Sequence, residues 1–257
     1  MAVELVAEIG SNHNGDSGTA MRLIYEAAQA GANTVKFQHY PPDGRYGPHP
    51  LGKGWMQGFQ IHAKDCGVDF LCSVFDQDTL EDYLVACAPS RVKIASPELT
   101  DHQLLRACGN AGLHVILSTG MSTEQQISEA VRVIEETGVS VTLLQCVSSY
   151  PAPPEEMNLM AMRRLSRYGK VGLSDHSLNP IVAPVTATAL GAVMVEKHFT
   201  LDRSQDGPDH GYAVDPEGFG AMVEAVRLCE RMLGDGRKRV MESEDPTDRR
   251  TEEWRAA

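Results

Sequence analysis

The chain has 257 residues, a length that fits one large domain or two small ones, and its hydrophobic fraction of 42% is sufficient for a large core. Its formal net charge of −12 at pH 7 argues against nucleic acid or an acidic lipid surface as a partner. Six cysteines without a CxxC spacing, an N-terminus without a signal-peptide pattern and the lack of a membrane-length apolar run predict a cytoplasmic protein with reduced thiols.

Short apolar segments alternate with segments of helical periodicity along the whole sequence. The first predicted helix has an apolar face at Met21, Leu23 and Ile24, and a capping box of Ser122 or Thr123 with Glu124-Gln125 begins a later one. Glycines stand where four helices are expected to end, at Gly31, Gly67, Gly112 and Gly138. We predict buried strands at residues 3–9, 33–38, 68–75, 91–95, 113–118, 141–147, 170–174 and 192–198.

Eight strands alternating with helices, at about 30 residues per unit, predict a (β/α)8 TIM barrel. We expect this barrel to be a single domain over residues 1–233, followed by a charged, linker-like tail over residues 234–257. An open doubly wound sheet is the alternative, but the number of strands and the lack of a GxGxxG motif after the first strand disfavour it.

Polar or charged residues follow nearly every predicted strand. The carboxyl ends of barrel strands meet at one rim, where the active sites of this fold lie, so we expect these side chains to lie together. Unpaired buried charges are costly, which makes the pattern unlike that of a barrel core. The residues are Glu8, Asn12, His13, Asn14, Lys36, Gln38, Ser73, Lys93, Ser96, Glu98, Ser118, Thr119, Ser148, Tyr150, Ser174, Asp175, His176, Glu196, Lys197 and His198.

The residues of this set suit three roles, which are anion binding, metal binding and acid–base chemistry. Two lysines with several hydroxyl groups suit a phosphate and a carboxylate. His176 and His198 follow consecutive strands and can share one divalent metal ion, for which Mn²⁺ is expected, with Mg²⁺, Co²⁺ or Zn²⁺ as alternatives. Glu8, Glu98 and Asp209 can act as acids, bases or hydroxyl acceptors. The plainer interpretation of the histidines is a pair of polar loop residues.

Eight ordered sequence blocks resemble the sialic acid synthase (N-acetylneuraminate synthase, NeuB-like) family, from Ala7 to about Glu244. Members of that family condense phosphoenolpyruvate with an aldehyde sugar to give a nine-carbon 2-keto acid. The resemblance is carried by Ala7 to Gly15, Val35 to Gln38, Lys93 to Glu98, Ile116 to Met121, Leu144 to Cys146 with Tyr150-Pro151, Gly172 to His176, Glu196 to Thr200, and Gly207 to Asp209.

The resemblance implies a role for each matching position. His176 and His198 are similar to the two metal ligands. Glu8 and Asp209 match acidic residues that hold the sugar and the metal's water, and Glu98 matches the acid or base. Lys36 and Lys93 would also stabilise charge during C–O cleavage. The implied phosphoenolpyruvate site consists of Lys36, Ser73, Lys93, Ser96, Ser118, Ser148, Tyr150 and Ser174, with Ser148 where sialic acid synthases place asparagine.

Two features depart from the family. The loop after the second strand is short, at residues 41–55, and the sequence lacks the C-terminal antifreeze-like domain that covers the neighbouring subunit's sugar site. We therefore expect an aldehyde acceptor that differs from N-acetylmannosamine, or a lid supplied by a separate protein. The residues expected to line the altered acceptor side are His39, Tyr40, Arg45, Tyr46, His49 and Trp55. The family also implies a homodimer, and the tail could serve as a docking arm.

Two alternative functions remain at this stage. One is a metal-dependent pyruvate aldolase on the same barrel, which would not release inorganic phosphate. The other is a non-catalytic barrel that acts as a binding subunit, although the two histidines and both lysines of the rim are retained. The expected partners are phosphoenolpyruvate and an aldehyde, with neither nucleic acid nor membrane.

Overall fold

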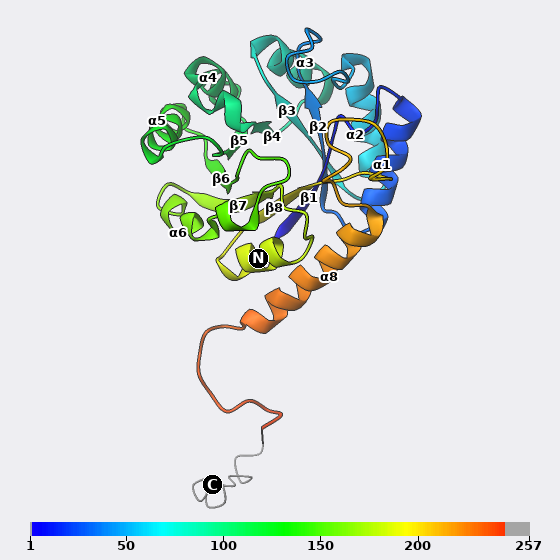
Figure 1. Ribbon diagram of the computed structural model, residues 1–257. Helices are drawn as coiled ribbons and strands as arrows, with labels where there is room; N and C mark the ends of the chain where they lie inside the picture. Colours follow the sequence, from blue (N-terminus) through cyan, green and yellow to red (C-terminus); the bar gives the residue numbers. More distant parts are fainter. Residues whose placement is uncertain (1, 245–257) are drawn as a thin grey trace, which may run out of the picture.

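The computed structural model describes residues 2–244, and within them eight parallel strands close into a barrel in chain order, with β1 beside β8 (Figure 1). The predicted (β/α)8 barrel is confirmed, and each predicted strand end lies within two residues of the observed one. The strands are β1 Glu4–Gly10, β2 Thr34–His39, β3 Asp69–Val74, β4 Arg91–Ile94, β5 His114–Ser118, β6 Val141–Gln145, β7 Lys170–Asp175 and β8 Met194–His198.

Helices follow the strands and surround the barrel (Figure 1). The four glycines expected at helix ends all have positive φ, which a residue without Cβ adopts at little cost. The capping box of α5 joins Thr123 to Gln126. Thr123 was one of the two predicted capping residues, but the predicted partners Glu124-Gln125 are not members of the box. The helices are α1 Ser17–Gln29, α2 Met56–Asp65, α3 Gln77–Cys87, α4 His102–Asn110, α5 Glu124–Glu135, α6 Met162–Leu165, α7 Val182–Ala189 and α8 Pro216–Leu233.

The segment after β6 is the least regular of the strand-to-strand connections. It holds prolines at 151, 153 and 154, which remove amide donors and resist helical continuation, so two short 3₁₀ turns (Pro154–Glu156 and Leu159–Ala161) precede the four-residue α6. This long connection brings Tyr150 over the carboxyl ends of β7 and β8, where its ring packs on that of His176.

Alternate residues of the strands fill the barrel interior. An apolar layer of Val6, Leu71, Ile116, Leu144 and Met194 crosses its middle. Two residues further along each of these strands come Glu8, Ser73, Ser118, Cys146 and Glu196, all buried. The opposite faces of the strands pack on the helices in the main hydrophobic core. The strand alternation therefore places the polar set on the inner side of the carboxyl-terminal rim.

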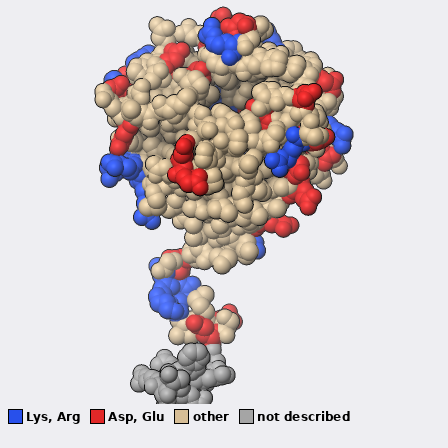
Figure 2. All heavy atoms as spheres, viewed as in Figure 1, with Lys and Arg blue, Asp and Glu red and all other residues tan. Residues whose placement is uncertain are grey.

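The outer surface carries acidic and basic side chains interspersed, as the face in Figure 2 shows. Residues 234–244, which follow α8, extend from the barrel (Figure 1). They are exposed, and Arg239 forms an ion pair with Asp235. The rest of the predicted tail lies outside the described residues. Among residues 2–244, no helix has the length and apolar character needed to cross a bilayer. The six cysteines, all in this range, are free thiols.

Candidate active site

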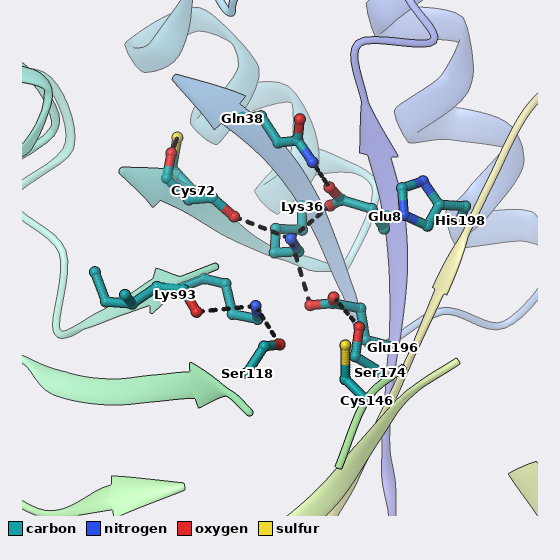
Figure 3. Close-up of polar contacts among 12 residues, drawn as sticks. Glu8, Lys36, Gln38, Cys72, Lys93, Ser118, Cys146, Ser174, Glu196 and His198 are labelled. Atoms are coloured by element: carbon teal, nitrogen blue, oxygen red, sulfur yellow. Dashed lines mark hydrogen bonds and ion pairs between the residues drawn. The ribbon is translucent and has the colours of Figure 1, made fainter. Parts of the chain in front are cut away.

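Lys36 lies at the centre of the rim, between two carboxylates (Figure 3). Its Nζ is 3.0 Å from Glu8 Oε2 and 3.4 Å from Glu196 Oε2, and it donates a 3.0 Å hydrogen bond to Ser73 Oγ. Gln38 Nε2 donates to the other oxygen of Glu8 at 2.7 Å, and Ser174 Oγ donates to Glu196 at 2.8 Å. Strands β1, β2, β3, β7 and β8 thus contribute to one buried polar cluster.

The two carboxylates beside Lys36 differ in proton affinity. Burial and the neighbouring Glu196 raise the pKa of Glu8 to about 7, although Lys36 opposes the shift. Burial would also raise the pKa of Glu196, but Lys36 and Lys93 outweigh it and lower that pKa to about 2. Glu8 can therefore take up or release a proton near neutral pH, whereas Glu196 stays ionised.

Lys93 occupies a second, hydroxyl-rich part of the rim. Its Nζ donates to Ser118 Oγ at 2.7 Å and to the Ile94 carbonyl at 3.2 Å. Nearby, the Gly120 amide donates to Ser96 Oγ at 3.0 Å. A Cβ at residue 120 would lie 2.3 Å from Ser148 Oγ and 3.0 Å from Ser96 Oγ, so only glycine allows these hydroxyls to approach.

His176 and His198 lie side by side, with ring centroids 5.5 Å apart. The Nδ1–H of His176 donates to the Val147 carbonyl at 2.7 Å, which leaves Nε2 as the lone-pair nitrogen, 3.4 Å from Ser174 Oγ. His198 Nδ1 is buried, receives no hydrogen bond from a described residue and lies 3.6 Å from Asp209 Oδ2. Burial lowers the pKa of His198 to about 4, so its neutral, metal-binding form predominates at pH 7.

This donor set fits a metal ion held by two imidazoles, because one ring is oriented by a backbone carbonyl and the other has an unpartnered buried nitrogen. Among the described residues, no group of three or more His, Cys, Asp or Glu side chains is arranged as a complete set of ligands. Water or substrate atoms would have to supply the other positions, which suits a catalytic rather than a structural site.

Two adjoining cavities open at the rim and share Gln38, Tyr150 and His198. The inner one, of about 50 Å³, is lined by Glu8, Lys36, Gln38, Ser73, Lys93, Ala95, Ser96, Pro97, Ser118, Cys146, Tyr150, Ser174, His176, Glu196 and His198. The second, of about 320 Å³, is lined by Ser11, Gln38, Tyr46, Tyr150, His198, Pro208, Asp209 and Tyr212. The Tyr212 hydroxyl donates to Asp209 Oδ1.

Most of the site residues predicted from the sequence meet at these cavities. Glu98 and Ser148 are not among the residues that line them. Glu98 lies just beyond Ser96 and Pro97, and burial raises its pKa to about 7. Ser148 is in the same region, with its Oγ 4.0 Å from Cys146 Sγ.

Besides Glu98 and Ser148, the residues of the expected rim set that do not line the cavities are Asn12, His13, Asn14, Thr119, Asp175 and Lys197. Asp175 and Lys197 form a buried ion pair with each other on the outer side of the barrel. Conversely, sequence reasoning missed Cys146 and Tyr212 and gave Glu196 no role. The alternation of strand residues explains the positions of Cys146, Asp175 and Lys197. Cys146 is two residues beyond the inward-facing Leu144 and so also faces inward. Asp175 and Lys197 each directly follow an inward-facing residue and so face outward.

The loop after β2 covers the second cavity with one aromatic residue. The Tyr46 ring packs on Phe75, with centroids 4.6 Å apart. Of the six residues expected to line the acceptor side, Tyr46 alone is among the described residues that line this cavity. His39 instead hydrogen-bonds to the Leu51 carbonyl, and Trp55 packs on Phe59. The other five do not line this cavity, and Tyr40 among them is buried.

The fold and the polar rim define a TIM-barrel enzyme, with its chemistry at the carboxyl ends of the strands. Residues 46–238 match the family model described as the NeuB family. An uncharacterised protein of Methanocaldococcus jannaschii is 41% identical in an alignment of 253 positions that covers 93% of this chain and 74% of the relative. The N,N'-diacetyllegionaminic acid synthase of Legionella pneumophila is 34% identical in an alignment of 277 positions that covers 96% of this chain and 77% of the relative.

A solved structure agrees with these sequence relatives. The N-acetylneuraminic acid synthetase of Leptospira borgpetersenii has a TM-score of 0.89 and 33% identity, and the match covers 95% of this chain and 89% of that one. The chain therefore belongs to the NeuB family of synthases.

Proposed function

We propose that the protein condenses phosphoenolpyruvate with an aldehyde acceptor, with the help of a divalent metal ion, and forms a nonulosonate-type 2-keto acid and phosphate. Relatives named as synthases of legionaminic, pseudaminic and N-acetylneuraminic acids support this reaction class. The observation that carries the proposal is the pair of buried ammonium groups of Lys36 and Lys93 at one hydroxyl-lined rim. Such a set suits a small, multiply charged anion.

The anionic substrate would bind in the inner cavity. Lys93, Ser118 and Ser96 supply a cation and two hydroxyls for the phosphate, and the Gly120 amide holds Ser96 in place. Lys36 can stabilise the carboxylate, since its ammonium group is already held in a buried setting. These donors are fixed before substrate arrives, so they stabilise developing charge without reorganising.

The bond changes of the proposed reaction are those that the family resemblance implies. Carbon 3 of phosphoenolpyruvate attacks the aldehyde carbon, the aldehyde oxygen takes up a proton, and water adds to carbon 2. The tetrahedral adduct then loses phosphate by cleavage of its C–O bond. Glu8 and Glu98, each with a pKa of about 7, can accept the proton from water and return one to the nascent hydroxyl.

His176 and His198 would hold the metal ion between the two cavities, with Asp209 beside His198. Bound there, a divalent ion supplies Lewis-acid polarisation of an aldehyde carbonyl. Val147 keeps the His176 ring in one orientation through its carbonyl, and Tyr150 covers the ring with an aromatic face, at a centroid distance of 4.2 Å. These contacts limit the access of bulk water to the imidazole.

The second cavity would receive the acceptor. Three tyrosines offer apolar faces to a sugar-like ring, and Asp209 offers a carboxylate to its hydroxyl groups. Tyr46, from the short loop after β2, forms part of this wall, and we propose that the shortened loop suits an acceptor other than N-acetylmannosamine.

The test is incubation with phosphoenolpyruvate, Mn²⁺ and a panel of aldehydes, with phosphate release and product mass as readouts. Phosphate release with a product heavier by a three-carbon keto acid supports the proposal, and Lys93→Met should abolish it while the exposed Lys170→Met does not. Condensation of free pyruvate without phosphate release would instead indicate an aldolase. Efficient turnover of N-acetylmannosamine alone would refute the different acceptor.

A further inference from the structure

Asp175 and Lys197 form a charged pair outside the site but directly behind it. The ladder between β7 and β8 pairs Ser174 with Glu196 and, one step further, Asp175 with Lys197. Successive strand residues point to opposite faces, so the first pair faces the cavity and the second faces the surrounding helices. Asp175 and Lys197 are each only 1% exposed, so their charges are removed from water.

A buried ion pair is unusual between the outward faces of β7 and β8 and the surrounding helices, where apolar side chains pack. Outward-facing neighbours on the same two strands are apolar, among them Leu173 and Val195. Two opposite charges in such a setting often contribute no more stability than apolar residues of the same size, because desolvation offsets their attraction. Stability alone therefore gives a weak reason for the pair, and its hydrogen bonds point to a role in orientation.

Those hydrogen bonds close a turn around His176. Lys197 Nζ donates to Asp175 Oδ2 at 2.8 Å and to the Ser177 carbonyl at 2.7 Å. The Ser177 amide donates to Asp175 Oδ1 at 2.8 Å. His176 is thus held between two residues bound to the same ammonium group. Lys197 also directly precedes His198, so one pair joins the backbone segments of both imidazoles.

We propose that Asp175 and Lys197 are a positioning pair that fixes the separation of the His176 and His198 rings for one metal ion. This inference rests on the metal site of the proposed function. The pair acts through the backbone, and neither residue touches substrate. Its loss should weaken metal binding, whereas the anion-binding residues on β2, β4 and β5 should be unaffected.

The experiment measures Mn²⁺ affinity of the full chain by calorimetry, with urea unfolding and phosphoenolpyruvate affinity measured alongside. Asp175→Asn and Lys197→Met should each weaken Mn²⁺ binding by about 10- to 100-fold, as loss of orienting groups around metal ligands does elsewhere. Phosphoenolpyruvate affinity without metal should not change. The double variant Asp175→Leu with Lys197→Met leaves no buried charge, so it should fold and still bind Mn²⁺ weakly.

Arg91→Met is the matched control. It removes a cation paired with Glu4 at 2.7 Å and Asp69 at 3.1 Å, at the amino-terminal ends of the strands, and it should lower stability without changing Mn²⁺ affinity. If the folded double variant binds Mn²⁺ as tightly as the wild type, the pair is only structural and the inference is overturned. If the wild type itself binds no divalent ion, the metal part of the proposed function fails as well.

Discussion

Replacement of Lys36 by methionine should destabilise the protein strongly, and more at high pH than at low pH. The substitution leaves Glu8 and Glu196 buried without the cation that lies 3.0 and 3.4 Å from them. Removal of one partner from a buried ion pair costs about 3–5 kcal/mol. The pKa of Glu196 agrees in direction, because Lys36 contributes most among the groups that hold this pKa below its ordinary value of 4.5.

The pH dependence follows from the two carboxylates. In the wild type, the lowered pKa of Glu196 contributes stability that is present above about pH 4.5 and is lost as the pH falls toward 2. Without Lys36, both carboxyls should have pKa values raised above their ordinary value of 4.5. When burial raises the pKa of a carboxyl group, the folded protein loses stability as the pH rises toward that pKa. The deficit of Lys36→Met should therefore be largest at pH 8 and smaller at pH 5.

Urea unfolding of both proteins at pH 5, 6.5 and 8 measures this deficit. Addition of Glu8→Gln to Lys36→Met should recover part of the stability at pH 8, because one of the two unpaired charges is gone. Lys170→Met, at the exposed start of β7, should stay within about 0.5 kcal/mol of the wild type. An equal deficit at all three pH values would refute the reasoning from buried carboxylates.

Three further outcomes are expected. The wild type should lose stability as the pH rises from 4.5 to about 7, because burial of Glu98 opposes its ionisation in the folded state. Glu98→Gln should not show this loss, and urea unfolding of both proteins at pH 5 and 8 measures the difference. Gly120→Ala should weaken phosphoenolpyruvate binding and cost about 1–3 kcal/mol, since its Cβ would lie 2.3 Å from Ser148 Oγ; unchanged calorimetric affinity would contradict this. His176→Ala and His198→Ala should each lose bound metal and activity together, and a variant that keeps both would argue against the imidazole site.

The barrel could be predicted from the sequence because its strands are short apolar runs, buried on both sides, and glycines mark the helix ends that precede four of them. The site could be predicted because the carboxyl ends of parallel strands meet at one rim. Lys36, Lys93 and His198 had to come together once the sheet closed. The expected rim also held Asp175 and Lys197, because the position of a residue near a strand end was considered without its inward or outward direction.

Loop structure was harder to predict for a physical reason. The place of Tyr46 depends on packing against Phe75, a contact between segments that no local pattern connects. Tyr212 lies in an irregular segment after β8, where its hydroxyl donates to Asp209. A helix was expected between β6 and β7, but the shortness of α6 was not predicted, although the prolines before it are visible in the sequence. In a helix or a strand, the sequence period indicates which face is buried. A loop has no such period, so its sequence does not indicate where its side chains point.

The apolar layer across the middle of the barrel separates two polar regions. Val6, Leu71, Ile116, Leu144 and Met194 lie between the candidate site and a network at the amino-terminal mouth, where Arg91 binds Glu4 and Asp69 around a cavity of about 640 Å³. No polar side chain in this described layer can relay a proton or a hydrogen bond from one mouth to the other. Charged residues at the lower mouth can therefore be exchanged in engineering without opening a proton path to the carboxyls above the layer.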